Sequence, residues 1–182
     1  DDANPGLTPR AISEVMRCVH RDSNKCSVKM ECYMLELYRD DLIDLLLPQG
    51  AVETPKLEIK KDKKGWVTVP NATVVSVTSA EEINNVVQAG LKVRKTAGTK
   101  MNVESSRSHL IFSIVMESTD LQTGAVTKGK LSFVDLAGSE RVKKSGAQGY
   151  TLKEAQAINK SLSALGDVIS ALASEQQHIP YR

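Results

Sequence analysis

The sequence lacks the features that mark membrane, secreted and nucleic-acid-binding proteins. No apolar run approaches the roughly 20 residues of a membrane-spanning helix. Lys and Arg number 24 against 22 Asp and Glu, and a net charge of only +2 argues against a general nucleic-acid binder. Cys18, Cys26 and Cys32 form neither a CxxC pair nor an even set, so we interpret them as reduced thiols of a cytosolic protein. The acidic Asp1 and Asp2 stand where a signal peptide would be basic, so no targeting segment is expected.

What is present is typical of one globular domain: 182 residues, 41% hydrophobic and 25% charged. Apolar residues at helical spacing, with capping signals at Thr8-Pro9 and at Ser79 and Glu82, predict three helices. Alternating or continuous apolar stretches predict the strands, and the apolar strands 110–116 and 131–134 are expected to be covered on both faces. Two predicted helices start near residues 8 and 79, and a third spans about 151–174. The predicted strands are 28–35, 57–59, 66–69, 110–116 and 131–134, with a short helical turn at 40–46. Strands that alternate with helices indicate a layered α/β domain.

A strand-end carboxylate is the most informative feature. The stretch reads Gly129-Lys-Leu-Ser-Phe-Val-Asp-Leu-Ala-Gly-Ser-Glu140, in which Asp135 ends an apolar strand and Gly138 follows three residues later. In nucleoside-triphosphate switches such an Asp lies near a phosphate-bound Mg²⁺, and such a glycine lets a backbone N–H approach the γ-phosphate. A DxxG tetrapeptide alone is typical of any strand that enters a turn. The complete hexapeptide after an apolar strand is far rarer by chance and favours the switch.

Hydroxyl groups gather in a second segment, Asn102-Val-Glu-Ser-Ser-Arg-Ser-His109, directly before the apolar strand at 110–116. Adjacent hydroxyls can ligate Mg²⁺ and hold a phosphate oxygen or the attacking water. The arginine can bind a carboxylate through two hydrogen bonds. The alternative for this segment alone is a serine-rich turn that caps a strand. Two such loops, each next to a buried strand, together favour a nucleotide switch.

Both segments resemble the switch loops of the kinesins, with 102–109 similar to switch I and 135–140 to switch II. Asn159-Lys-Ser-Leu-Ser-Ala-Leu-Gly166 resembles the start of the family's relay helix, and His178-Ile-Pro-Tyr-Arg182 its microtubule-facing loop. The resemblance covers the whole chain, 1–182. It implies an α/β fold of the P-loop NTPase type, with a central, mostly parallel sheet and helices on both faces. It is strongest to the C-terminal-motor group, and there to the calmodulin-binding kinesins of plants and green algae.

The resemblance implies an ATP-driven microtubule motor of the cytoplasm and cytoskeleton, with ATP and Mg²⁺ as its ligands. Asp135 would approach Mg²⁺ through water, and Ser106 would join the Mg²⁺ ligands when switch I closes. Gly138 would sense the γ-phosphate through its N–H. Ser105 would orient phosphate or water, and Asn102 belongs to the same catalytic set.

Further roles follow from the same resemblance. Arg107 and Glu140 would form the ion pair that joins the two switches and positions the attacking water. Asn159 would tie the relay helix to that pair. Glu154 is either a solvated helix residue or part of the water relay, and the solvated helix residue is favoured. His109 is expected to cap its strand rather than transfer protons.

Four residues are predicted to contact the microtubule: Lys143, Lys144, Tyr181 and Arg182. The two lysines would face the acidic tubulin surface from the loop between switch II and the relay helix. A calmodulin-like partner would act through segments outside these residues. No nucleic-acid partner is expected.

The chain departs from the family pattern in one respect. Kinesins carry the phosphate-binding loop G-x-x-x-x-G-K-[ST], and no such sequence occurs here. We therefore expect 1–182 to be the later part of a motor domain, cut at both ends and inactive as an isolated fragment, because the cradle for the β- and γ-phosphates is missing. The rival hypothesis is a non-catalytic microtubule-binding module that has lost this loop.

Overall fold

The computed structural model describes residues 5–48, 50–51, 55–63, 65–101, 105–139 and 150–181. No helix within them is long and apolar enough to cross a lipid bilayer. The elements follow in the order α1 (Leu7–Arg21), β1 (Cys26–Tyr38), β2 (Asp41–Asp44), β3 (Lys60–Lys61), β4 (Val67–Thr68), β5 (Val75–Val77), α2 (Ala80–Met101), the 3-10 helix η1 (Ser105–Arg107), β6 (His109–Asp120), β7 (Val126–Asp135) and α4 (Tyr150–Ala173).

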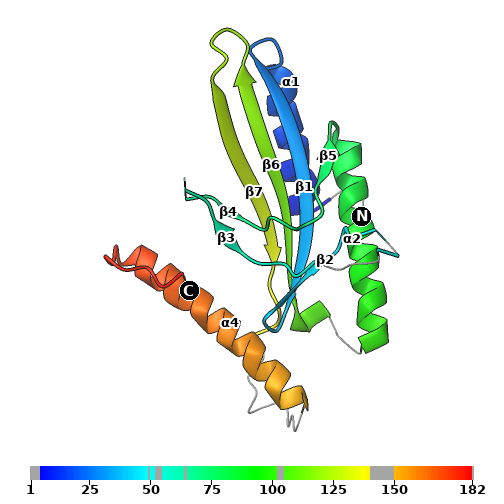
Figure 1. The fold of residues 1–182 in the computed structure, drawn as a ribbon, viewed down its shortest axis with the longest axis vertical. Helices are drawn as coiled ribbons and strands as arrows, with labels where there is room; N and C mark the ends of the chain where they lie inside the picture. Colours follow the sequence, from blue (N-terminus) through cyan, green and yellow to red (C-terminus); the bar gives the residue numbers. More distant parts are fainter. Residues whose placement is uncertain are drawn as a thin grey trace.

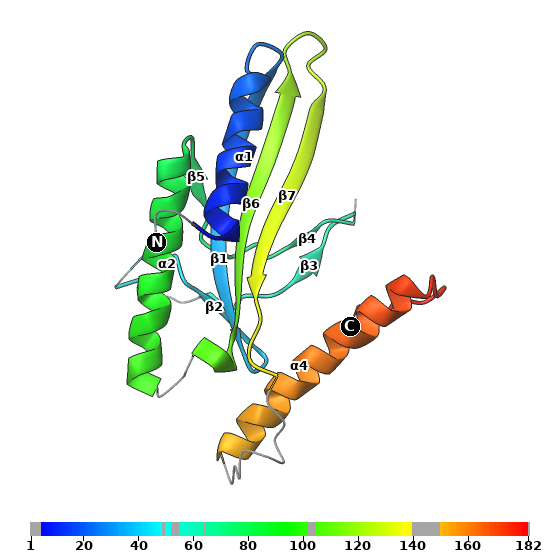
Figure 2. The same cartoon turned by 180° about the vertical axis from the view of Figure 1, so that it is seen from behind.

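The main sheet has the strand order β2-β1-β6-β7, and β5 pairs with β1 beside this path. Along one side β1 pairs with β6, and along the other with β5 at Met30–Cys32 and with β2 at Leu35–Tyr38. β3 and β4 form a separate hairpin, seen in front of the sheet in Figure 1 and behind it in Figure 2. β6 therefore lies inside the sheet, with a strand on each side.

Strand direction differs from the mostly parallel sheet that the sequence predicted. Every pairing within the described residues is antiparallel, so this detail of the expectation is corrected. β1 and β2, like β6 and β7, are consecutive strands joined by short turns, which permit only antiparallel pairing. β5 and β6 both run antiparallel to β1, so they are parallel to each other. α2 connects β5 to β6, and a long crossover of this kind is what two parallel strands of one sheet require.

One face of the sheet carries the hydrophobic core. α1 and α2 pack there, behind the sheet in Figure 1 and in front of it in Figure 2. Alternate residues of β1 and β6 point towards these helices because side chains alternate along a strand. The core includes Ile12, Met16, Met30, Cys32, Met34, Ile83, Phe112 and Ile114, each no more than 5% exposed.

α2 lies close against the sheet at Gly90. A Cβ atom at this position would lie 2.3 Å from the Sδ atom of Met34, whose side chain is itself buried. Only glycine therefore lets this turn of the helix lie against β1 without displacing Met34. The close approach fixes the height at which the next turn, with Arg94, lies over the sheet.

The opposite face of the sheet is more open than expected. The Nζ of Lys130 donates to the carbonyl of Val67 at 2.9 Å, which ties β7 to β4, but Val134 remains 53% exposed. α4 extends away from the sheet, beyond the end where β6 begins and β7 ends (Figures 1 and 2). Full cover of the strand at 131–134 is therefore corrected for the described residues. A continuous apolar run predicts burial only where another layer packs on each face.

Local interactions at the ends of helices and strands explain where the observed elements agree with, or differ from, those predicted from the sequence. The backbone N–H of Glu82 donates to the Ser79 hydroxyl at 3.1 Å, which confirms the predicted cap of α2. α1 begins at Leu7 after Gly6, just before the expected cap. Asp41–Asp44 forms β2 instead of a helical turn because Arg39, with φ at 58°, reverses the chain directly. The sequence did not indicate this hairpin, because its turn lacks the Asn-Gly or Asp-Gly that is typical of such turns.

Candidate nucleotide-switch site

Two neighbouring residues where β6 begins, Ser108 and His109, direct their side chains to opposite faces of the sheet. Ser108 is fully buried and lies on the α2 face, near Glu36 of β1. His109 is 7% exposed and contacts Ser161 of α4. The alternation of side chains along a strand explains this division. Two separate groups of polar contacts therefore meet at one strand end.

The first group is a buried ionic cluster around Arg94 of α2. Its Nε donates to Glu36 Oε1 at 3.2 Å, and its Nη1 to Asp135 Oδ2 at 3.3 Å. Its Nη2 donates to the carbonyl and the hydroxyl oxygen of Ser108 at 3.1 and 3.2 Å. The Ser108 hydroxyl donates in turn to Glu36 Oε1 at 2.5 Å. The guanidinium is 8% exposed, so these partners replace the water that it loses on burial.

The second group centres on the His109 imidazole. The backbone N–H of Ala137 donates to its Nδ1 at 2.9 Å, so the ring proton lies on Nε2. Nε2 therefore donates to the Ser161 hydroxyl at 2.8 Å, and that hydroxyl donates to the carbonyl of Ile158 at 2.7 Å. Burial of the ring, together with the positive charge of Arg94, lowers the pKa of His109 from its ordinary value, although the Asp135 carboxylate opposes this shift. The imidazole is held neutral in the tautomer that both contacts need.

The two predicted switch segments meet directly. The backbone N–H of Gly138 donates to the carbonyl of Ser106 at 2.6 Å. Asp135 ends β7 in register with Leu110 near the start of β6. Its side chain is 69% exposed, although one oxygen binds Arg94. Ser106, Asp135 and Gly138, which the sequence placed at one site, therefore lie at the same edge of the sheet.

Comparison with known proteins identifies the family behind this arrangement. A family model described as Kinesin motor domain matches residues 1–182. This chain belongs to the kinesin motor-domain family. Kinesin-like protein KIN-14I of Oryza sativa subsp. japonica is 64% identical over 179 residues, 98% of this chain and 14% of that protein. Kinesin-like protein KIN-14E of Arabidopsis thaliana is 60% identical over 181 residues, 100% of this chain and 14% of that protein.

A solved structure of a fast kinesin superposes on this chain with a TM-score of 0.85 and 39% identity. The match covers 100% of this chain and 51% of the solved chain, so these residues span about half the length of that kinesin chain. The kinesin fold of the P-loop NTPase type is thereby confirmed, and the KIN-14 relatives confirm the predicted C-terminal-motor group.

Several predicted residues of this kinesin chain lie outside the described residues: Asn102, Glu140, Lys143, Lys144 and Arg182. The pairing of Arg107 with Glu140, and the microtubule contacts of the lysines, therefore stay predictions. The backbone of Ser105 belongs to η1, next to Ser106. Asn159 is half-buried in α4, and Tyr181 is 68% exposed beyond that helix.

The donor set of the kinesin site fits Mg²⁺. Asp135 and Ser106 offer a carboxylate and a hydroxyl oxygen, the hard ligands that this ion prefers. No group of three or more His, Cys, Asp or Glu side chains within the described residues could hold a metal ion as a cage. Mg²⁺ does not require such a cage, because it keeps several waters and shares phosphate oxygens with its nucleotide. The exposed carboxylate of Asp135 leaves room for a contact through water.

Sequence reasoning missed Glu36, Arg94 and Ser161. Glu36 carried a signal, because it continues the alternation that places Met30, Cys32 and Met34 on the buried face. A carboxylate on such a face needs a charged partner. Arg94 follows Ile83 by 11 residues, three helical turns, and so lies on the same face of α2. Ser161 carried no signal of its own, since serine is common on exposed helix faces.

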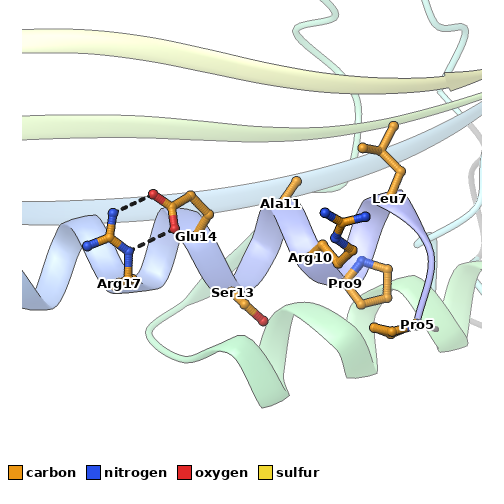
Figure 3. Close-up of a pocket in the computed structure, with 8 residues that line it drawn as sticks. All are labelled: Pro5, Leu7, Pro9, Arg10, Ala11, Ser13, Glu14 and Arg17. Atoms are coloured by element: carbon orange, nitrogen blue, oxygen red, sulfur yellow. Dashed lines mark hydrogen bonds and ion pairs between the residues drawn. The ribbon is translucent and has the colours of Figure 1, made fainter. Parts of the chain in front are cut away.

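A surface pocket lies along α1, away from the switches. Pro9, Arg10 and Glu14 line it, together with Arg17 (Figure 3). Two hydrogen bonds of 2.8 and 2.6 Å join Arg17 to Glu14 along the helix. None of the residues that line this pocket is among the predicted site residues.

Proposed function

We propose that the protein containing this chain is an ATP-driven microtubule motor whose two switch loops sense the γ-phosphate. The observation that carries the proposal is the 2.6 Å bond from the Gly138 N–H to the Ser106 carbonyl. A γ-phosphate oxygen that accepts the Gly138 N–H would compete with this carbonyl. Arrival and loss of the phosphate would then change the contact between the switches, as in other nucleotide switches.

The residues divide into binding and positioning roles. Asp135 and Ser106 would hold Mg²⁺, which supplies charge neutralisation for the β- and γ-phosphates. Arg94 would orient the Asp135 carboxylate, because it holds one oxygen of that group and leaves the side chain exposed. Ser105 and Asn102 would orient the phosphate or the attacking water.

Contact between the switches would be completed by an ion pair of Arg107 and Glu140, which positions the attacking water. Asn159 would join α4 to this pair. On the microtubule side, Lys143, Lys144 and Arg182 would meet acidic tubulin, and the exposed Tyr181 would contact the same surface. The motor would act in the cytoplasm on the cytoskeleton. Control by calmodulin would require segments outside these residues, and the 182 residues alone would not hydrolyse ATP.

Gly138→Ala in the intact motor tests the proposal. The variant should still bind ATP, but the change in microtubule affinity between ADP and a non-hydrolysable ATP analogue should fall by about tenfold or more, since the added methyl hinders approach of the phosphate. The measurements are nucleotide titration, microtubule cosedimentation and thermal melting.

A Gly138→Ala motor that is less stable yet fully coupled would show that this glycine serves the turn alone. A wild-type protein that binds microtubules but never hydrolyses ATP would establish the non-catalytic module instead. Gly166→Ala on α4 is the control for a glycine replacement outside the switch segments, because no described atom beyond the backbone of its own helix lies within 4 Å of the added carbon.

A further inference from the structure

We propose that His109 is a positioning residue that transmits displacement of switch II to α4. This inference rests on the proposed motor function and assigns a role to a side chain beyond the Mg²⁺ and phosphate contacts. The imidazole connects the backbone N–H of Ala137 with the hydroxyl of Ser161, at 2.9 and 2.8 Å. This side chain therefore contacts both switch II and α4.

The chemistry of the ring suits this bridge. A neutral imidazole has one acceptor and one donor on opposite sides of a rigid plane. Both are used here, and the ring is 7% exposed, so water does not readily replace either partner. The acceptor is specified by the peptide N–H of Ala137, which can only donate. The donor is specified by Ser161, whose own proton is directed to the carbonyl of Ile158.

The strand that carries His109 gives the bridge a fixed base. β6 is paired on both sides, with Leu37 of β1 opposite His109 and Asp135 of β7 opposite Leu110. The adjacent Ser108 is held in the buried Arg94 cluster. Neighbouring strands hold β6 on both of its edges at His109. A shift of Ala137 therefore acts on the ring and on its α4 partner and is not absorbed by movement of β6.

The switch end of the bridge is coupled to the phosphate sensor through the chain itself. Ala137 directly precedes Gly138, whose N–H donates to Ser106. When Gly138 exchanges this acceptor for a phosphate oxygen, the peptide of Ala137 must move with it. The hydrogen bond to Nδ1 then changes, and with it the bond that Nε2 makes to α4.

Ser161→Ala in the intact motor removes the α4 partner and leaves the ring in place. The ratio of microtubule dissociation constants in ADP and in a non-hydrolysable ATP analogue should fall about three- to tenfold, which matches the loss of one hydrogen bond from the coupling. Ser161→Thr keeps a hydroxyl and should restore the ratio. Ser163→Ala, an exposed serine on the same helix, is the matched control and should behave as wild type.

His109→Gln tests the other half of the bridge. Its amide can still donate towards Ser161, but Ala137 loses its acceptor, so the same ratio should fall. The double variant with Ser161→Ala should lose little more than either single variant, because both changes interrupt one connection.

Equal ratios for Ser161→Ala and Ser163→Ala would overturn the inference, as would a lower melting temperature with an unchanged ratio. A wild-type motor with no dependence of microtubule affinity on nucleotide would overturn the proposed function as well. A normal wild-type ratio that Ser161→Ala leaves intact would refute the role of His109 alone.

Discussion

The α2 side and the α4 side of the strand end at β6 differ in the kind of interaction that they contain. On the α2 side, Arg94, Glu36 and Ser108 form a charged network that is shielded from water. On the α4 side, the neutral His109 ring makes one hydrogen bond at each nitrogen. A buried charge that loses its partner is costly, whereas a neutral hydrogen bond contributes little net stability. We therefore expect substitutions on the α2 side to lower the stability of the fold. Substitutions on the α4 side should instead weaken the coupling between nucleotide state and microtubule affinity.

Arg94→Met should have the largest effect. It leaves the buried Glu36 carboxylate without its guanidinium, so we expect a loss of about 3–5 kcal/mol in the free energy of unfolding of the intact motor domain. Urea unfolding measures it. Glu36→Gln in the Arg94→Met background should recover part of the loss, because it removes the uncompensated charge. A loss below about 1 kcal/mol would mean that the cluster does not hold the α2 side together.

Gly90→Ala on α2 and Gly166→Ala on α4 together compare how closely these two helices are packed against the rest of the protein. We expect it to lower the free energy of unfolding by about 1–3 kcal/mol, because the new methyl overlaps Met34 in a packed core. Gly166→Ala on α4 meets no described atom within 4 Å, and alanine is the better helix former. Thermal melts of the two variants should therefore differ, with the Gly166 variant the more stable. Equal destabilisation would show that another part of the protein packs on α4 at Gly166.

A small pH dependence should distinguish the α4 side. The lowered pKa of His109 means that the unfolded chain takes up the proton more readily than the folded one. The stability that this residue contributes is therefore complete above its ordinary pKa, near 6.5, and is lost progressively as pH falls below that value.

The free energy of unfolding of wild type and of His109→Gln, measured from pH 8 to pH 5, checks this expectation. The difference between the two curves isolates the histidine from Arg94 and Asp135, the charged groups that act on it. The wild-type curve should fall more steeply below about pH 6.5. Parallel curves would contradict the assignment of a buried, neutral ring.

Local sequence was sufficient where a short segment determines its own structure. The Ser79 and Glu82 signal placed the start of α2, because the cap needs only residues three positions apart. The apolar stripe gave α4 nearly its observed limits. The motifs at 102–109 and 135–140 also predicted that Ser106, Asp135 and Gly138 lie at one site, since each motif adjoins the end of a strand that the sequence predicted.

Tertiary structure alone decided which distant side chains meet. Arg94 reaches Glu36 across 58 residues, and His109 reaches Ser161 across 52. Neither pairing follows from propensity or periodicity, because both depend on the register of β1, β6 and β7 and on how closely Gly90 lets α2 approach. The same holds for strand direction and for the exposure of Val134 on β7, as the described residues show. Patterns along the chain specify which face of an element is apolar, whereas the layer that covers that face is set by packing between elements far apart in sequence.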